Sequence, residues 1–479
     1  GTLLAGDRVR AGREPRQGRA ARPAMILAAS ALLCGLALAA AVFPVADSRC
    51  ERAFRIAAGA ALGLGASGAA SMAVRLCKLP TQGKDVALVV ASAVALAAVR
   101  ARGLRVETTA ERASPNRMLA VTTALSATVV VLLFVEHTVR YPDGGWDARA
   151  IWNLRARAFH RAPMRLDLLL SPEMPESHPD YPLLVPALVA DAFAVSGEDS
   201  YGSAAIAFAF SALLVAVAAT GAAALRGADA GFVAALVVLG FPALLQMGWS
   251  QCADVPLATF LATASGLAVL SRGRPGALAL AGFAASLCAL TKNEGLVWAS
   301  ALGIAVLTAI GRRACGSFLL GAVPGLLLLA TFKVRFAPAN DLAVATTAAG
   351  LASRITDPWR AVAVARGLVA QLWNFPMWGL SGPALAVAAA WPPLRTVPPE
   401  EATLLRVLRR TLALCLASVF VIYLTAPRDV AMLLPVSADR LLMQLAGVAV
   451  LLGSLHLSTP GVRPLVPLCR APSRGTTEG

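Results

Sequence analysis

Apolar residues recur along the chain in blocks of about 15–22 residues, each long enough or nearly long enough to cross about 30 Å of hydrocarbon as a helix. The blocks are rich in Ala, Leu, Val and Gly, and such small residues let membrane helices pack closely. They predict helices at 25–44, 56–74, 86–100, 118–136, 203–225, 229–248, 255–271, 277–291, 296–311, 316–334, 372–391, 411–426 and 440–457. The pattern therefore predicts an all-α, polytopic transmembrane bundle of 12–13 helices.

Two polar segments interrupt the apolar pattern, at 137–181 and at about 335–362. The apolar stretch 182–197 contains Asp191, and we expect it to lie along the membrane interface, because a spanning helix there would invert every later loop. The predicted organisation is a basic N-terminal segment (1–24), N-terminal membrane helices (25–136), an external loop with interfacial helices (137–200), a membrane core (201–457) and a polar cytoplasmic tail (458–479).

Composition agrees with a membrane protein. Hydrophobic residues make up 57% of the chain and charged residues only 15%, whereas soluble domains carry about a quarter charged residues. The net charge of +16 would suggest nucleic acid in a soluble protein, but most basic residues here lie in short loops between apolar blocks. We therefore predict the lipid bilayer, and no nucleic acid, as a partner. The eight cysteines have no CxxC spacing, so they indicate neither a disulfide framework nor a zinc site.

Arginines in alternate loops predict the orientation of the chain. The arginines that mark the cytoplasmic side are Arg272, Arg274, Arg312, Arg313, Arg406, Arg409 and Arg410. By the positive-inside rule, the segments 137–181, 248–254, 335–362 and 427–440 then face outside. The prediction is a multi-pass protein of a bacterial inner or plasma membrane whose polar loops face outside.

The N-terminal region conflicts with this orientation. Four helices before the first external loop would place the N-terminus outside, yet residues 1–22 carry six arginines. Two explanations stay open: the short segment 86–100 does not span, or the native chain starts at Met25.

The segment 141–160 is the richest in candidate chemistry. Residues 142–145, Pro-Asp-Gly-Gly, predict a turn, and residues 146–160 predict a helix. One helix face would carry Trp146, Ala150, Asn153 and Arg157. Asp147 falls in the first helical turn, where the helix dipole favours a carboxylate by about 0.3–1 kcal/mol. From these residues alone, an interfacial helix is as well supported as a catalytic one.

Four other charged groups lie at predicted helix ends. They are Asp180 with His178, Asp254, Lys292 with Glu294, and Asp439 with Arg440. Each has an ordinary interpretation: an exposed loop carboxylate, a loop ion pair worth about 0–1 kcal/mol, or a helix-start residue with an interfacial anchor. The four histidines have no metal-ligand spacing, so no cofactor and no structural metal are predicted, while a loosely bound Mg²⁺ stays open.

Five segments in the same order carry a resemblance to a known family. They are Gly144–Arg157 (GGWDARAIWNLRAR), His178–Pro186 (HPDYPLLVP), Gln251–Ala258 (QCADVPLA), Thr291–Leu296 (TKNEGL) and Ser437–Leu442 (SADRLL). Together they resemble the external motifs of bacterial GT-C membrane glycosyltransferases of the protein-mannosyltransferase and aminoarabinose-transferase type. The chain departs from that pattern with Arg149 in place of Trp, Cys252 in place of Tyr, and additional helices before the first loop.

The resemblance implies a glycosyltransferase that moves a sugar from a polyprenyl-phosphate-linked donor to a lipid, glycan or protein acceptor. It implies that Asp147 is the catalytic base, with Arg149 or Arg155 keeping it ionised. The implied substrate-binding residues are Trp146, Asn153, Arg155, Asp180, Asp254, Lys292, Glu294, Asp439 and Arg440. Lys292 would hold the lipid phosphate with Glu294 orienting it, and Arg440 would grip the phosphate in a fork.

Two other functions stay open. A secondary transporter or a flippase for lipid-linked sugars would need charges on broken helices at mid-bilayer and usually internal repeats, whereas these charges fall at helix ends and no repeat is evident. A non-catalytic scaffold of the GT-C type is kept open by the departures at Arg149 and Cys252.

Overall fold

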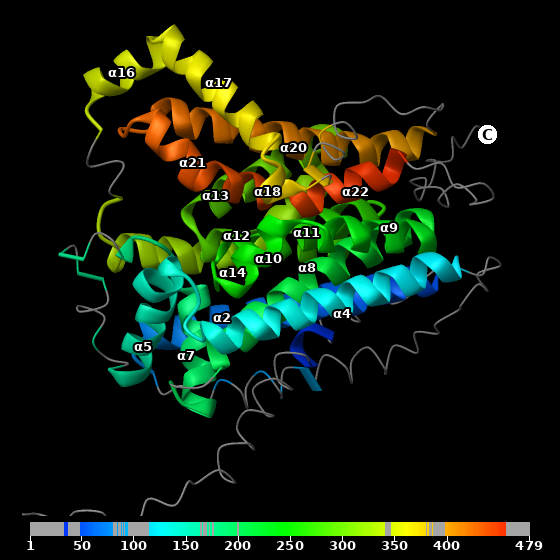
Figure 1. The fold of residues 1–479 in the computed structure, drawn as a ribbon, viewed down its shortest axis with the longest axis horizontal. Coiled ribbons are helices and arrows are strands. Elements are labelled where there is room, and N and C mark those ends of the chain that lie inside the picture. Colours follow the sequence, from blue (N-terminus) through cyan, green and yellow to red (C-terminus); the bar gives the residue numbers. More distant parts are fainter. Residues whose placement is uncertain are drawn as a thin grey trace, which may run out of the picture.

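The computed structural model is all-α over the residues that it describes (Figure 1). The described residues are 33–36, 48–79, 115–162, 177–198, 201–340, 346–379 and 398–456, with single positions at 84, 88, 90, 92, 93, 165, 170, 171, 173, 174, 381, 382 and 386. Most of the predicted helices 25–44 and 86–100, and the second half of 372–391, fall outside them.

Among the described residues, five helices are long and apolar enough to cross a membrane. They are α2 (Arg49–Leu76), α4 (Arg117–Arg140), α8 (Gly202–Arg226), α14 (Arg312–Arg335) and α20 (Pro399–Thr425). Two bent pairs raise the number to seven: α9 (Ala228–Leu239) with α10 (Pro242–Trp249), and α21 (Val430–Met443) with α22 (Ala446–His456). The chain is therefore an integral multi-pass membrane protein, and the prediction of an all-α polytopic bundle is confirmed.

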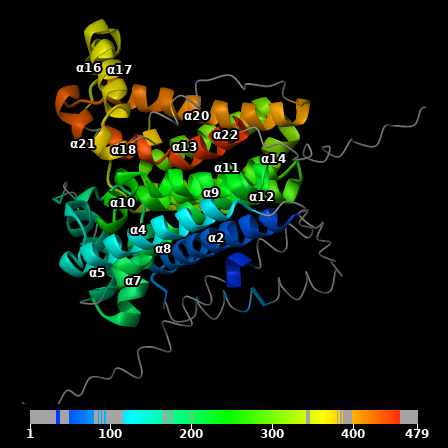
Figure 2. The ribbon, with the colours of Figure 1, turned by 45° about the vertical axis from the view of Figure 1, so that its right-hand side comes forward.

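Shorter apolar helices complete the core. They are α7 (Leu184–Ser196), α11 (Asp254–Leu270), α12 (Pro275–Thr291) and α13 (Asn293–Ala309). Helix α11 is buried along its whole length, and the other helices surround it (Figure 2).

Helix boundaries differ from the prediction where the chain bends. The segment 229–248 bends by 64° between α9 and α10, because Pro242 at the first position of α10 cannot continue the hydrogen-bond ladder of α9. The last predicted helix, 440–457, is also two helices, bent by 51°. Asp439 and Arg440 therefore lie in the last turns of α21, not at the start of the last helix.

Two predicted loops contain helix. Helix α20 begins at Pro399, so Arg406, Arg409 and Arg410 lie within a helix rather than in a loop. The polar segment 335–362 contains α16 (Ala348–Thr356) and the start of α17 (Pro358–Leu372). A short helix, α18 (Phe375–Trp378), follows α17. Hydropathy does not detect these elements, because polar residues form helices as readily outside the membrane as apolar residues do inside it.

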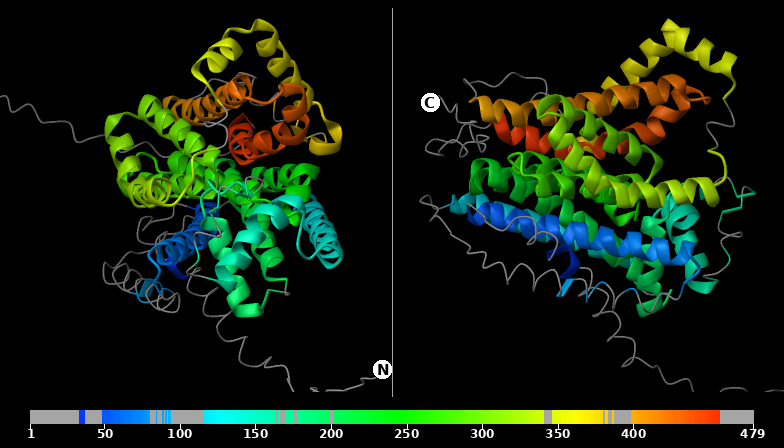
Figure 3. Two further views of the ribbon diagram at one scale, coloured as in Figure 1. Left: turned by 90° about the vertical axis from the view of Figure 1, so that its left-hand side faces the viewer. Right: turned by 180° about the vertical axis from the view of Figure 1, so that it is seen from behind.

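The two ends of the bundle differ in the residues and helices that lie there. At one end, which we call the arginine end, Arg226 forms an ion pair with Glu401 and Arg272 lies 4.0 Å from Glu51. At the opposite end, the loop end, lie α5 (Asn153–Arg161) and α7 (Figure 3). The arginines used to predict orientation thus group away from the polar loop 137–181, while the side of the membrane that each end faces stays a prediction.

Helix α7 runs across the ends of the long helices rather than along them (Figures 1 and 3). It packs on α2, α5 and α8. Its one carboxylate, Asp191, is buried and forms ion pairs with Arg75 at 2.7 Å and with Lys84. The interfacial position of 182–197 stays a prediction.

Helices α12 and α14 approach each other very closely in the core. A Cβ atom at Gly282 would lie 1.8 Å from the Phe318 carbonyl oxygen, and one at Gly321 would lie 1.8 Å from the Ala279 carbonyl oxygen. Glycine is required at both positions because only the absence of a side chain lets the two backbones approach so closely.

The variant Gly321→Ala should lower the stability of the protein by about 1–3 kcal/mol, because the added methyl group must force the two backbones apart. The matched control is Gly316→Ala on the same helix, where a Cβ would meet nothing within 4 Å. Thermal unfolding of both variants in detergent micelles tests this expectation. Equal melting temperatures for the two variants would contradict the close contact.

A charged cluster at the loop end

The polar loop before Asp147 is held by the turn that precedes α11. Gly144 has a φ of +71°, which favours glycine, and the Gly145 N–H donates to the Ser250 carbonyl at 3.1 Å. The Asn153 amide donates to the Gln251 side chain at 2.7 Å, and the Gln251 amide donates to the Pro142 carbonyl at 2.8 Å. These bonds fix Asp147 relative to Asp254, which begins α11 three residues after Gln251.

A π-helical turn changes the predicted face of the loop helix. Residues Ala148–Trp152 form the π-turn η1, and the α-helix α5 starts only at Asn153. The wider turn shifts the register of side chains. As a result Asn153 is buried while Trp146 is 57% exposed, so the shared face that the spacing predicted for these residues is wrong.

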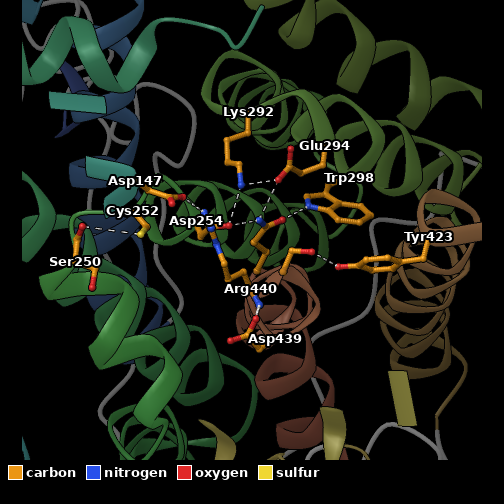
Figure 4. Close-up of polar contacts among 12 residues, drawn as sticks. Asp147, Ser250, Cys252, Asp254, Lys292, Glu294, Trp298, Tyr423, Asp439 and Arg440 are labelled. Carbon is orange, nitrogen blue, oxygen red and sulfur yellow. Dashed lines mark hydrogen bonds and ion pairs between the residues drawn. The ribbon is translucent and has the colours of Figure 1, made fainter. Parts of the chain in front are cut away.

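Asp254 is the centre of the charged cluster. Its side chain is fully buried, and it accepts hydrogen bonds from Lys292 Nζ at 3.0 Å, from Arg440 at 2.8 Å and from the Gln444 amide at 2.6 Å (Figure 4). A buried carboxylate is stable only when cations and donors compensate for the lost water. The interpretation of Asp254 as an exposed loop residue is therefore wrong.

Arg440 bridges two carboxylates. One of its terminal nitrogens donates to Asp147 Oδ2 at 2.5 Å and to Asp254 Oδ2 at 2.8 Å. The side chains of Asp147 and Arg440 are each 18% exposed, whereas that of Asp254 is 0% exposed. The cluster thus has a closed side at Asp254 and an accessible edge at Asp147. The cation beside Asp147 is Arg440, and not Arg149 or Arg155 as predicted.

Lys292 occupies the junction between α12 and α13, outside both helices, and its backbone is extended there (φ −148°, ψ 161°). Its ammonium group lies 2.7 Å from Glu294 as well as 3.0 Å from Asp254. Burial alone would lower the pKa of Lys292, but the two carboxylates outweigh it and hold the pKa above its ordinary value. Lys292 is therefore a permanent cation, buried in a network rather than exposed in a loop ion pair.

Gln444 and Trp298 complete the network, and sequence analysis did not identify them. The Trp298 indole N–H donates to the Gln444 side chain at 2.7 Å, and the Gln444 amide lies 3.4 Å from Glu294. Gln444 follows Arg440 by four residues in the chain, so both point to one side of the chain near the α21–α22 bend. That spacing was the signal available in the sequence.

Asp180 forms a second, adjacent network. It is buried and accepts from the Asn293 amide at 2.6 Å and from the Asn340 amide at 2.7 Å, while the Lys333 ammonium group lies 3.8 Å from it. Asn293 directly follows Lys292, so the two networks meet at the start of α13. Lys333 is separated from Asp180 by 153 positions, and no local pattern pointed to it.

Arg155 supports the loop instead of pairing with Asp147. It donates to the carbonyl oxygens of Ser177 at 2.5 Å and Tyr181 at 3.2 Å, and to that of His178. Burial lowers the pKa of Arg155 to about 10. Tyr181 in turn stacks on His178, and Lys292 lies 6.0 Å from the centre of its ring. Arg155 thereby holds the 177–181 segment against the cluster.

The structure brings five of the ten predicted site residues into direct contact: Asp147, Asp254, Lys292, Glu294 and Arg440. Asp180, Asn153 and Arg155 lie in the networks around them. Asp439 accepts from the backbone N–H of Arg440 at 2.8 Å, and no polar contact of Trp146 is seen among the described residues. Whether these residues bind substrate stays a prediction for all ten.

The described residues contain no group of three or more His, Cys, Asp or Glu side chains arranged to hold a metal ion. Lys292 and Arg440 pair with the three carboxylates of the cluster, Asp147, Asp254 and Glu294. The loosely bound Mg²⁺ that the sequence leaves open is not tested by these contacts.

Comparisons with known proteins give one structural likeness. No family model matches the chain, and no curated protein matches it. Among solved structures, the chain is similar to the crystal structure of ArnT from Cupriavidus metallidurans bound to undecaprenyl phosphate, with a TM-score of 0.43 and 16% identity over 68% of this chain. The chain covers 59% of the length of that protein.

The variant Asp254→Asn should lower stability by about 1–3 kcal/mol, because Lys292 and Arg440 each lose a buried charged partner and keep only Glu294 and Asp147. The matched control is Asp143→Asn in the neighbouring loop. Asp143 is half exposed and pairs with Arg157, so its loss should cost only about 0–1 kcal/mol. Thermal unfolding in detergent measures both. Similar melting temperatures for the two variants would show that Asp254 does not anchor the cluster.

Proposed function

We propose that this protein is a membrane glycosyltransferase of the GT-C type, which moves a sugar from a polyprenyl-phosphate-linked donor to an acceptor hydroxyl on the external side. One observation carries the proposal: Arg440 joins Asp147 to Asp254 and thereby to Lys292. These residues come from four of the five segments whose order resembles the family. Asp180, from the remaining segment, accepts a hydrogen bond from Asn293, which directly follows Lys292 in the chain.

The accessible edge of the cluster suits Asp147 as the base. In the proposed reaction, the acceptor oxygen forms a bond to the anomeric carbon while the bond from that carbon to the phosphate oxygen breaks. The proton of the acceptor hydroxyl goes to the Asp147 carboxylate, and the polyprenyl phosphate leaves with its electron pair. A single base with no second carboxylate acting as nucleophile predicts inversion at the anomeric carbon.

The two cations would stabilise the leaving phosphate. Lys292 is held in place by Asp254 and Glu294, so it presents a fixed positive charge where negative charge develops. Arg440 has two carboxylate partners, and it would exchange the Asp147 contact for a phosphate oxygen when the donor binds. That exchange frees Asp147 to accept a proton, so the same arginine would couple donor binding to activation of the base.

A flippase for lipid-linked sugars is the second candidate. The observation that favours it is the position of Arg440 beside the bend between α21 and α22, since transporters often place charges at broken helices. The transferase is better supported, because the cluster lies at the loop end and has a carboxylate at its accessible edge. Movement of a fluorescent polyprenyl-phosphate sugar across vesicles, without sugar transfer, would favour the flippase.

The variant Asp147→Asn should reduce sugar transfer by about 10²- to 10⁴-fold, because the base is lost, while donor binding is retained. The assay uses purified protein in lipid vesicles with undecaprenyl phosphate carrying glucose, mannose or aminoarabinose. Asp143→Asn, in the same loop but paired with Arg157, is the matched control and should transfer at the rate of the unmodified chain. Full activity of Asp147→Asn would refute the assignment of the base.

Single-cysteine labelling should show that the segments 137–181 and 427–440, on either side of the cluster in the sequence, both face outside. After replacement of the eight native cysteines, Ser171→Cys and Arg428→Cys should each react in intact cells with a maleimide that does not cross membranes. Arg313→Cys, an exposed position at the arginine end, is the control and should react only after the cells are opened. Labelling of either loop only from inside would mean that the site cannot meet an external acceptor.

A further inference from the structure

Two cavities lie along α4, and Leu245 of α10 lines both of them. The first has a volume of about 180 Å³ and is bordered almost entirely by apolar side chains of α4, α8 and the α9–α10 pair. The second has a volume of about 480 Å³ and lies at the loop end, beside Gly144 and Gly145. Since they share a wall, we treat them as one feature and call it the α4 groove.

A single stripe of α4 forms one side of the groove. The residues of this stripe are Ala127, Val130, Val131 and Phe134 in the apolar part and His137 in the polar part, and Tyr141, directly after α4, lines the polar part as well. Their spacing of three and four positions places them on one helix face. At 1.5 Å per residue, Ala127 and His137 are about 15 Å apart along the helix, which is about half the thickness of the hydrocarbon core. The groove therefore matches the depth of one lipid leaflet.

The polar part of the groove is positively charged. Arg149 is the one permanent cation among the residues that line it, and no carboxylate lines it. The nearby carboxylates are engaged elsewhere, since Asp143 pairs with Arg157 and Asp147 pairs with Arg440. Among the described residues, Arg149 itself makes no ion pair. An anion at the mouth of the groove would meet an available guanidinium group, which binds phosphate through two parallel hydrogen bonds.

Aromatic rings border the same mouth. His137 stacks on Trp249 with ring centres 4.5 Å apart, and Tyr141 lies 4.9 Å from His137. Tryptophan and tyrosine favour the level of lipid headgroups. Along the groove, the apolar cavity is followed by the aromatic rings and then by Arg149. An anionic lipid has the matching order, since its hydrocarbon chain is followed by the polar linkage at the membrane interface and then by the phosphate.

We propose that the α4 groove binds an anionic lipid, with one hydrocarbon chain in the apolar cavity and its phosphate at Arg149. We further propose, resting on the function proposed above, that this lipid is the acceptor and presents a headgroup hydroxyl to Asp147. The acceptor is then a lipid rather than a glycan or a protein.

The placement of Asp147 separates this lipid from the donor. The turn before Asp147 contacts Ser250, which lines the groove, through the Gly145 N–H. The Asp147 carboxylate contacts Arg440, which together with Lys292 would hold the donor phosphate. Figure 4 shows the contact of Asp147 with Arg440. An acceptor in the groove and a donor at the cations would approach each other from opposite sides, which would put the acceptor oxygen and the leaving phosphate on opposite faces of the anomeric carbon, as an in-line displacement requires.

Native mass spectrometry of the full chain in detergent tests the lipid site directly. Phosphatidylglycerol should bind at least about tenfold more tightly than phosphatidylcholine with the same chains, because the choline cation of phosphatidylcholine cancels the charge of its phosphate and would be repelled by the Arg149 guanidinium group. Arg149→Gln should abolish this preference. Arg140→Gln, at the end of α4 but paired with Glu136 and 70% exposed, is the matched control and should keep it. Equal binding of the two lipids to the unmodified chain would overturn the proposal, as would an unchanged preference in Arg149→Gln.

Filling the apolar cavity tests whether the hydrocarbon chain of the lipid binds there. Ala212→Phe puts a ring into the apolar cavity that Ala212 lines, and should weaken binding of both lipids by about tenfold, since a chain of several methylene groups loses its place. Ala205→Phe on the same helix, exposed but outside the cavity, is the control and should bind as the unmodified chain does. Equal affinities of the two variants would place the lipid elsewhere.

A transfer assay separates the groove from the proposed function. Phosphatidylglycerol has free headgroup hydroxyls, so it serves as the acceptor with the same three undecaprenyl-phosphate sugars. If it accepts sugar, Ala212→Phe should raise KM for it with little change in kcat. If the unmodified chain binds phosphatidylglycerol but transfers no sugar to any acceptor, the proposed function fails and the lipid site stands. If sugar goes to another acceptor, or if KM is unchanged in Ala212→Phe, the acceptor assignment is overturned.

Discussion

The arrangement of the loop end depends on one buried carboxylate. Asp254 has no exposed surface, and an ionised carboxylate without water must find cations and donors nearby. It finds Lys292 from the α12–α13 junction and Arg440 and Gln444 from the end of α21. The need to compensate one charge therefore brings the starts of α11 and α13 and the α21–α22 bend to the same point.

Around this centre, fewer contacts hold each residue toward the accessible edge. Close backbone contact between α12 and α14 fixes the helix that ends at Lys292, and the Asn153–Gln251 bond fixes the loop before Asp147. Asp147 itself is held to the cluster by Arg440 alone among the described ion pairs. The proposed exchange of Asp147 for a donor phosphate requires an arginine that one buried carboxylate keeps in place while its contact at the accessible edge is released, and Arg440 has both contacts.

The same loop connects the cluster with the lipid-facing side of the bundle. Residues 143–147 touch the end of α10 through Gly145 and reach Arg440 through Asp147. Arg149, which departs from the pattern of the resembling family, faces the groove beside α4 rather than the cluster. In the proposed lipid site, this departure supplies the cation for the headgroup, whereas Lys292 and Arg440, the cations proposed for the donor phosphate, belong to the segments that carry the resemblance.

The sequence by itself determined the all-α class, most of the apolar helices, the grouping of arginines at one end and the identity of Asp147, Asp254, Lys292 and Arg440 as candidates. These features are local: hydropathy within a window and a few side chains in short motifs carry them. Only the tertiary structure decided that Arg440, and not Arg149 or Arg155, is the partner of Asp147, because these two residues are 293 positions apart. It also decided the π-turn after Asp147, the two helix bends, and the inclusion of Gln444, Trp298 and Lys333. Each of these follows from packing and charge compensation between distant segments, and no local pattern records which distant side chain will complete a buried network.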